Sequence, residues 1–137
     1  MKEQQLFALA RQARTRAYAP YSRFTVGAAL LAESGEIYCG CNIENASFGA
    51  TNCAERTAFF KAVEAGERRF SAIAIAGGKQ GEEDVFCPPC GMCRQVMGEF
   101  CTKDFVILLK AGDEIKRYTL GQLLPLAFSS ESMEETP

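Results

Sequence analysis

The chain has 137 residues, a length that predicts one domain over residues 1–137 with a single hydrophobic core. Its formal net charge of −2 argues against a large nucleic-acid interface, because such an interface needs a basic face. The chain contains no histidine. This excludes Ser-His and Cys-His pairs for nucleophilic catalysis and restricts any metal site to cysteine or carboxylate ligands.

The N-terminal segment bears on the compartment. Residues 1–5 lead into a mixed helix without the apolar stretch of a signal peptide, and no apolar run is long enough to span a bilayer. We therefore expect a cytoplasmic protein. In that reducing compartment the seven cysteines should be thiols, so their spacing is better interpreted as metal binding or catalysis than as disulfides.

The first part of the chain predicts a helix followed by a hairpin. Apolar residues recur at three- and four-residue spacing over 2–17, which is typical of an amphipathic helix, and Pro20 interrupts the chain just after it. An apolar run over 24–32 and a second strand over 36–42 flank a turn at Ser34, so we expect these strands to pair.

The remaining elements complete an α/β pattern. They are a loop at 43–52, a helix starting near Cys53, a strand at 70–76, a loop at 77–86, a helix at 90–100, strands at 105–109 and 114–118, and a short helix at 120–124. This order predicts a three-layer α/β/α sandwich with a five-stranded mixed sheet. The two strand–helix crossovers should bring both helix starts to one edge of the sheet. We expect the polar tail, 130–137, to fray.

Three cysteines at helix starts are the strongest functional signal. Cys53 precedes one predicted helix, and Cys90 and Cys93 form a Cys-x-x-Cys pair that opens the next. Three thiolates can hold one Zn²⁺ and leave a fourth position for water, which is the arrangement of a catalytic zinc site. Glu55, two residues after Cys53, would then be free to transfer protons.

The charge of this set suggests a role for Arg56. Three thiolates exceed the charge of Zn²⁺, which weakens the metal as a Lewis acid. Helix N-termini at Cys53 and Cys90 favour negative sulfur, and Arg56 could donate hydrogen bonds to the thiolates. We therefore expect Arg56 to stabilise the ligand thiolates without binding the metal itself.

Other cysteines leave alternatives open. Cys87 is the main rival as a fourth ligand, which would make the zinc site structural. Cys101 or the pair Cys39 and Cys41 could complete a closed site in principle, although the pair fits a buried strand face better. A Cys-x-x-Cys pair can also be redox-active without a metal. Structural zinc binding to a protein partner and thiol–disulfide chemistry thus remain as alternatives.

Four motifs carry a resemblance to a known family. They are YAPYSRF at 18–24, GCNIENA at 40–46, CAERTA at 53–58 and CGMCRQ at 90–95. Cys-x-Glu followed by Pro-Cys-x-x-Cys is the zinc deaminase pattern, in which the glutamate is not a ligand. From about residue 18 to 128 the chain is similar to the small homotetrameric cytidine deaminases.

This resemblance implies a function for the zinc site. It implies one Zn²⁺ per chain and hydrolytic deamination of cytidine and 2′-deoxycytidine to the uridine nucleosides and ammonia, a reaction of pyrimidine salvage. A zinc-activated water would attack C4 of the base while Glu55 transfers protons. A deaminase for a modified cytosine nucleoside would share this site. Editing of a polynucleotide fits poorly with a short, acidic chain.

The resemblance also implies substrate contacts and assembly. Asn42 and Glu44 match residues that hold the ribose hydroxyls, and Phe24 matches an aromatic that packs on the pyrimidine. The backbone at Ala54 is expected to contact the base carbonyl. A homotetramer with sites shared between subunits is implied, in which the loop aromatic Phe48 and the C-terminal aromatic Phe128 reach a substrate site.

Overall fold

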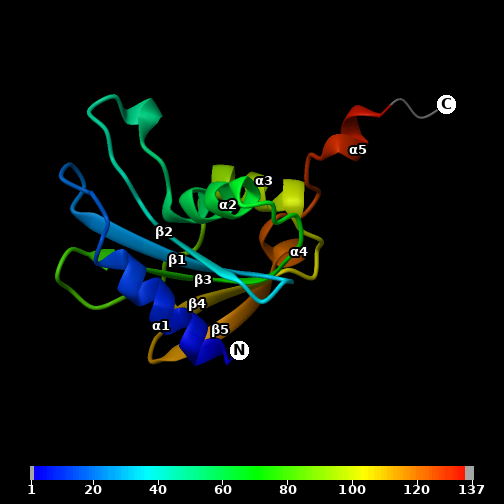
Figure 1. Ribbon diagram of the computed structural model, residues 1–137. Helices are drawn as coiled ribbons and strands as arrows, with labels where there is room; N and C mark the ends of the chain where they lie inside the picture. The colour runs from blue at the N-terminus through cyan, green and yellow to red at the C-terminus, as the bar shows by residue number, and fades with distance from the viewer. Residues whose placement is uncertain (1, 135–137) are drawn as a thin grey trace.

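The computed structural model describes residues 2–134 and has three layers (Figure 1). Helix α1 (Glu3–Arg14) covers one face of a five-stranded sheet, and α2 (Ala54–Glu64) and α3 (Gly91–Phe100) cover the other. The strands are β1 (Phe24–Ala32), β2 (Ile37–Cys41), β3 (Phe70–Lys79), β4 (Val106–Ala111) and β5 (Glu114–Thr119). The short helices are η1 (Phe48–Ala50), α4 (Leu120–Leu123) and α5 (Ser130–Met133). The predicted α/β/α sandwich is confirmed.

The strand order of the sheet is β2-β1-β3-β4-β5. Only the β3–β4 pair is parallel, whereas β1 runs antiparallel to both of its neighbours. Helix α2 therefore connects β2 to β3, and α3 connects β3 to β4, each joining strands of the same direction. Because both helices follow the carboxyl end of a strand, their N-termini lie at one edge of the sheet.

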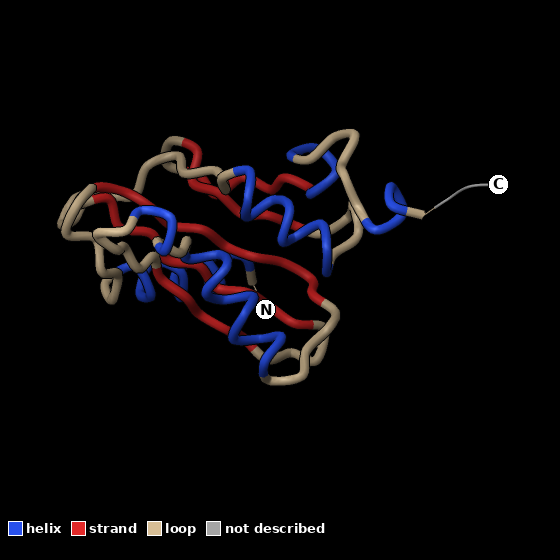
Figure 2. The backbone as a smooth tube through the Cα atoms, turned by 90° about the horizontal axis from the view of Figure 1, so that it is seen from above, coloured by secondary structure: helices blue, strands red, loops and turns tan. Residues whose placement is uncertain are grey.

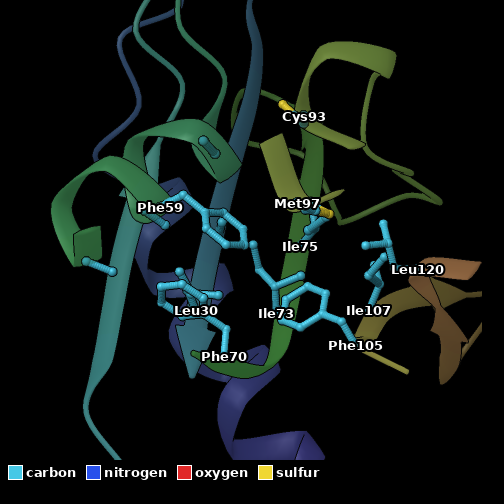
Figure 3. Packing of buried hydrophobic residues seen from close by; sticks show 14 of the residues in the cluster. Leu30, Phe59, Phe70, Ile73, Ile75, Cys93, Met97, Phe105, Ile107 and Leu120 are labelled. Carbon is cyan, nitrogen blue, oxygen red and sulfur yellow. The ribbon is translucent and has the colours of Figure 1, made fainter. Parts of the chain in front are cut away.

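Two apolar clusters hold the layers together. Phe59 of α2 and Met97 of α3 are fully buried against Leu30, Ile73 and Ile75 of the sheet (Figure 3). On the other face, Leu6, Phe7 and Ala10 of α1 form a second cluster with strand residues Ala29, Ala74 and Leu108. The nearly continuous apolar sequence of β1 and β3 follows from burial on both faces.

A glycine in β2 sets how closely α2 approaches the sheet. A Cβ at Gly40 would lie 2.6 Å from both the carbonyl oxygen of Ala54 and the amide nitrogen of Ala58. Such contacts are far inside van der Waals separation, so only glycine allows the first turns of α2 to pack this tightly. This close packing places the helix start, with Cys53, directly over the sheet edge.

The structure differs from the predicted boundaries at several points. Strand β4 ends at Ala111 rather than residue 109, and the turn η1 lies inside the loop predicted over 43–52. The two largest differences concern α1 and β3. Helix α1 ends at Arg14 rather than residue 17, because the amide of Tyr18 already donates to the carbonyl of Asn42 at 3.0 Å. Strand β3 continues to Lys79, since Gly77 and Gly78 still pair with β1. Tertiary pairing, which local periodicity does not report, decides both boundaries.

The C-terminal segment leaves the body of the molecule. It projects beyond α4 and carries one exposed helical turn, α5 (Figures 1 and 2). The tail predicted to fray, 130–137, lies partly outside the described residues, which end at 134. Within residues 2–134, every helix is too short or too polar to cross a bilayer.

Candidate active site

The two helix N-termini bring three cysteine sulfurs together. Cys53 caps α2 and Cys90 caps α3, both with extended backbone, and Cys93 lies in the first turn of α3. The sulfur of Cys90 is 3.7 Å from that of Cys53 and 3.5 Å from that of Cys93, and all three lie within 4.8 Å of one another. Thirty-seven positions separate Cys53 from Cys90 in the sequence.

These sulfur separations fit one tetrahedral zinc ion. Zn–S bonds of about 2.3 Å at tetrahedral angles place the sulfurs about 3.8 Å apart, whereas a disulfide needs about 2.05 Å. Within residues 2–134, Cys87 does not belong to this cluster of potential ligands. A set of three thiols therefore matches an open zinc site better than a closed four-cysteine site.

Arg56 contacts the cysteine cluster through Cys53. Its Nη2 donates a hydrogen bond of 3.3 Å to the sulfur of Cys53. Hydrogen bonding from the Cys93 thiol, reinforced by Arg56, lowers the pKa of Cys53 to about 5. The same contact raises the pKa of Cys93, because its proton is shared with the Cys53 sulfur. Sulfur at Cys53 is thus poised to be a thiolate, the form that binds metal.

Glu55 is buried beside this cluster. It lies in the first turn of α2 and is only 4% exposed. Burial, with a further contribution from negative charge at Cys53, raises the pKa of its carboxyl to about 7. A carboxyl with such a pKa can both accept and donate a proton near neutral pH, which suits general acid–base catalysis.

A small cavity opens onto Glu55 and the cysteines. Its volume is about 180 Å³, and ten residues line it: Val26, Asn42, Thr51, Asn52, Cys53, Ala54, Glu55, Cys87, Pro88 and Cys90. The sequence did not predict that Val26, Thr51, Asn52 and Pro88 would line this cavity. It indicated Cys87 only as a possible fourth zinc ligand. A strand start and two loops meet here, and no local motif signals that meeting.

Asn42 lines the cavity, and Glu44 lines a neighbouring hollow. The Asn42 amide is buried and bridges the backbone of β1, accepting from the amide of Val26 and donating to the carbonyl of Phe24, both at 2.8 Å. The Glu44 carboxylate accepts from the amides of Tyr21 and Ser22 and from the Ser22 hydroxyl. The Ser22 hydrogen bond is the main cause of a lowered Glu44 pKa.

The aromatic candidates lie at different distances from the cavity. Phe24 packs beside Gly77, which also contacts the sulfur of Cys87 in the cavity wall. Phe48 is 75% exposed and shares an adjoining hollow of about 380 Å³ with Glu44. Phe128 lies on the exposed C-terminal segment, where its carbonyl accepts a hydrogen bond from Gln95. Within one chain, none of Phe24, Phe48 and Phe128 is among the residues that line the cavity with Glu55.

Comparison with known proteins agrees with this geometry. A family model described as "Cytidine and deoxycytidylate deaminase zinc-binding region" matches residues 1–109. A cytidine deaminase of Sporosarcina psychrophila is 51% identical over 134 residues, covering 97% of this chain and 96% of that protein. A cytidine deaminase of Halalkalibacterium halodurans is 49% identical over 136 residues, covering 98% and 100%.

Solved structures give the same result. The crystal structure of a cytidine deaminase from Burkholderia pseudomallei superposes with a TM-score of 0.85 at 46% identity, covering 93% of this chain and all of that one. Fold and site together define an α/β/α protein in which three clustered thiols, a candidate metal site, lie beside a buried glutamate. The chain belongs to the cytidine and deoxycytidylate deaminase family and is an enzyme of that family.

Proposed function

We propose that the protein catalyses zinc-dependent hydrolytic deamination of cytidine and 2′-deoxycytidine, giving uridine or 2′-deoxyuridine and ammonia. One observation carries the proposal: three sulfurs at zinc-site separations adjoin a buried carboxyl that opens onto a small cavity. The names of the similar proteins support cytidine as substrate. The reaction belongs to pyrimidine salvage, and we place the protein in the cytoplasm as a single domain.

Cys53, Cys90 and Cys93 would hold one Zn²⁺ per chain. When bound, zinc acts as a Lewis acid that lowers the pKa of water and makes it a nucleophile near neutral pH. Arg56 donates a hydrogen bond to the Cys53 sulfur and offsets one of the three thiolate charges. Cys53 and Cys90 line the cavity, so a zinc ion held by the three sulfurs would be accessible from it to water and substrate.

Glu55 moves the protons of the reaction. Its carboxylate takes a proton from the attacking water as the oxygen adds to C4 of the base, and it delivers that proton to the neighbouring ring nitrogen. The remaining hydroxyl proton then passes through Glu55 to the amino group, which leaves as ammonia while the C4 carbonyl forms. Water is consumed and ammonia is released, so the protons balance.

The substrate contacts follow the cavity outward. The backbone of Ala54 would meet the base carbonyl, Phe24 would pack on the ring, and Asn42 with Glu44 would bind the ribose hydroxyls. Ala54 and Asn42 line the cavity, and Glu44 lines the adjoining hollow, which supports this order. Phe48 and Phe128 would act across subunits of a homotetramer, and their exposure in one chain is compatible with that role.

The test is an ultraviolet assay with cytidine and two matched variants. Glu55→Gln should retain one zinc per chain and lose turnover, whereas Glu64→Gln makes the same change at an exposed position of α2 and should leave turnover intact. A zinc-containing but inactive parent would redirect the proposal to modified cytosine nucleosides. A parent that binds zinc but deaminates neither cytidine nor a modified cytosine nucleoside would favour a structural zinc module.

A further inference from the structure

A buried ion pair joins the end of α1 to the connection between β3 and α3, outside the candidate active site. Nη1 of Arg14, in the last turn of α1, is 2.7 Å from Oδ1 of Asp84 in the connection between β3 and α3. The two side chains are only 9% and 2% exposed. Arg11, one turn earlier on α1, donates its Nε to the other Asp84 oxygen. The sequence pattern of this connection does not indicate such a contact.

Arg14 joins four segments of the chain. Its Nε donates to the hydroxyl of Thr25 at 2.9 Å and to the Thr25 carbonyl at 3.1 Å, and its Nη2 donates to the carbonyl of Lys79 at 2.6 Å. One guanidinium thus ties α1 to the start of β1, the end of β3 and, through Asp84, the connecting loop. A Cβ at Gly78 would lie 2.7 Å from Nη2 of Arg14, so this glycine makes room for the guanidinium.

The connection between β3 and α3, which Asp84 ties to Arg14, leads directly to the proposed metal ligand Cys90. The amide of Val85, next to Asp84, donates to the carbonyl of Gly77 at 2.7 Å. This contact forms an isolated antiparallel bridge between the loop and β3. A Cβ at Gly77 would be 2.5 Å from the sulfur of Cys87, which therefore packs on the strand backbone. Three residues later, Cys90 still has extended backbone, with φ −69° and ψ 169°. The loop, as well as helix α3, therefore sets where the Cys90 sulfur lies.

We propose that the Arg14–Asp84 pair positions the active-site loop and thereby holds Cys90 in place as a zinc ligand. The inference rests on the proposed function only in taking Cys90 as a ligand. Removing the Asp84 charge would leave Arg14 with an uncompensated buried charge, a state that the loop relieves by moving outward to admit water. The Cys90 sulfur would then lose its fixed distance to Cys53 and Cys93, and zinc would dissociate faster.

The experiment measures transfer of zinc from the holoprotein to a chromophoric chelator in the absence of substrate. Asp84→Asn keeps the shape of the side chain and should release zinc about tenfold faster, the lower end of what loss of ligand-orienting partners causes. Glu83→Gln makes the same chemical change at the adjacent exposed residue and should release zinc at the parental rate. Arg11→Gln, which removes the outer partner of Asp84, should give a smaller change in the same direction.

A second control separates positioning from general destabilisation. Leu6→Ala removes buried volume from the same helix without touching the loop, so it should lower the unfolding temperature but leave zinc release unchanged. In the cobalt-substituted protein, Asp84→Asn should weaken the sulfur-to-metal charge-transfer absorption, whereas Leu6→Ala should not. If Asp84→Asn does not fold, Arg11→Gln carries the same comparison.

Each outcome decides the inference. Parental zinc release and an unchanged cobalt spectrum in Asp84→Asn, or equal acceleration in Leu6→Ala, would overturn the positioning role while leaving the proposed function intact. A parent that binds zinc but does not deaminate cytidine would refute the proposed function. The order of zinc release rates would still test whether the Arg14–Asp84 pair positions Cys90. A parent that binds no zinc would refute both.

Discussion

Replacing Arg56 by alanine tests whether its positive charge stabilises the proposed zinc site, whose ligands are all thiolates. Three thiolates and one Zn²⁺ carry a net charge of −1, and the guanidinium of Arg56 brings the group to neutrality. The contact is direct, because Nη2 of Arg56 is 3.3 Å from the sulfur of Cys53. Among residues 2–134, the Nε of Arg56 is buried without a hydrogen-bond partner, and Cys53 is the side chain that its Nη2 contacts.

The size of the effect follows from that single contact. A hydrogen bond to a charged group contributes about 1.5–3 kcal/mol, which corresponds to roughly a 10- to 150-fold change in a binding constant. Loss of a partner that orients a metal ligand typically reduces metal affinity by about 10- to 100-fold. Since these ranges overlap, we expect Arg56→Ala to bind zinc about 10- to 100-fold more weakly.

The assay is competition for zinc against a chelator of known affinity, with three comparison variants. Arg56→Gln keeps an N–H donor without the charge, and Arg56→Lys keeps the charge without the planar fork, so together they separate the two contributions. Lys61→Ala removes one positive charge from the far end of α2 and should leave zinc affinity unchanged. Parental zinc affinity in Arg56→Ala would refute the charge-compensation argument.

Two further predictions test the fold around the site and the state of a thiol outside it. Gly40→Ala should destabilise the protein by about 1–3 kcal/mol, because its Cβ would press on Ala54 and Ala58. Urea denaturation should detect this loss, whereas Gly49→Ala, with open space around it, should have little effect; equal effects would contradict the argument. Burial raises the pKa of Cys101 to about 12, so its alkylation at pH 8 should be on the order of 10³-fold slower than that of an ordinary thiol. Mass-spectrometric mapping checks this, and the rate should rise with pH; rapid labelling at pH 8 would contradict the pKa shift.

The sequence alone predicted the five strands, the three long helices and the three cysteines that cluster in the structure, but not the short helices η1 and α5. Strand β1 has the boundaries that its apolar run predicts, because burial on both faces leaves a continuous signal. Cys53 and Cys90 were placed at helix starts, and each caps its helix in the structure. Residue spacing carries this information since helix and strand periods are local properties of the backbone.

Tertiary structure alone decided what surrounds those residues. Cys87 lines the cavity without joining the ligand cluster, and the Arg14–Asp84 pair links residues seventy positions apart. The raised pKa of Glu55 has its main cause in burial, which no feature of its neighbours in sequence reports. Periodicity and motif spacing describe contacts within a few residues, whereas cavities, buried ion pairs and desolvation arise where distant segments pack together. The physical reason is that burial is a property of the assembled layers rather than of any one of them.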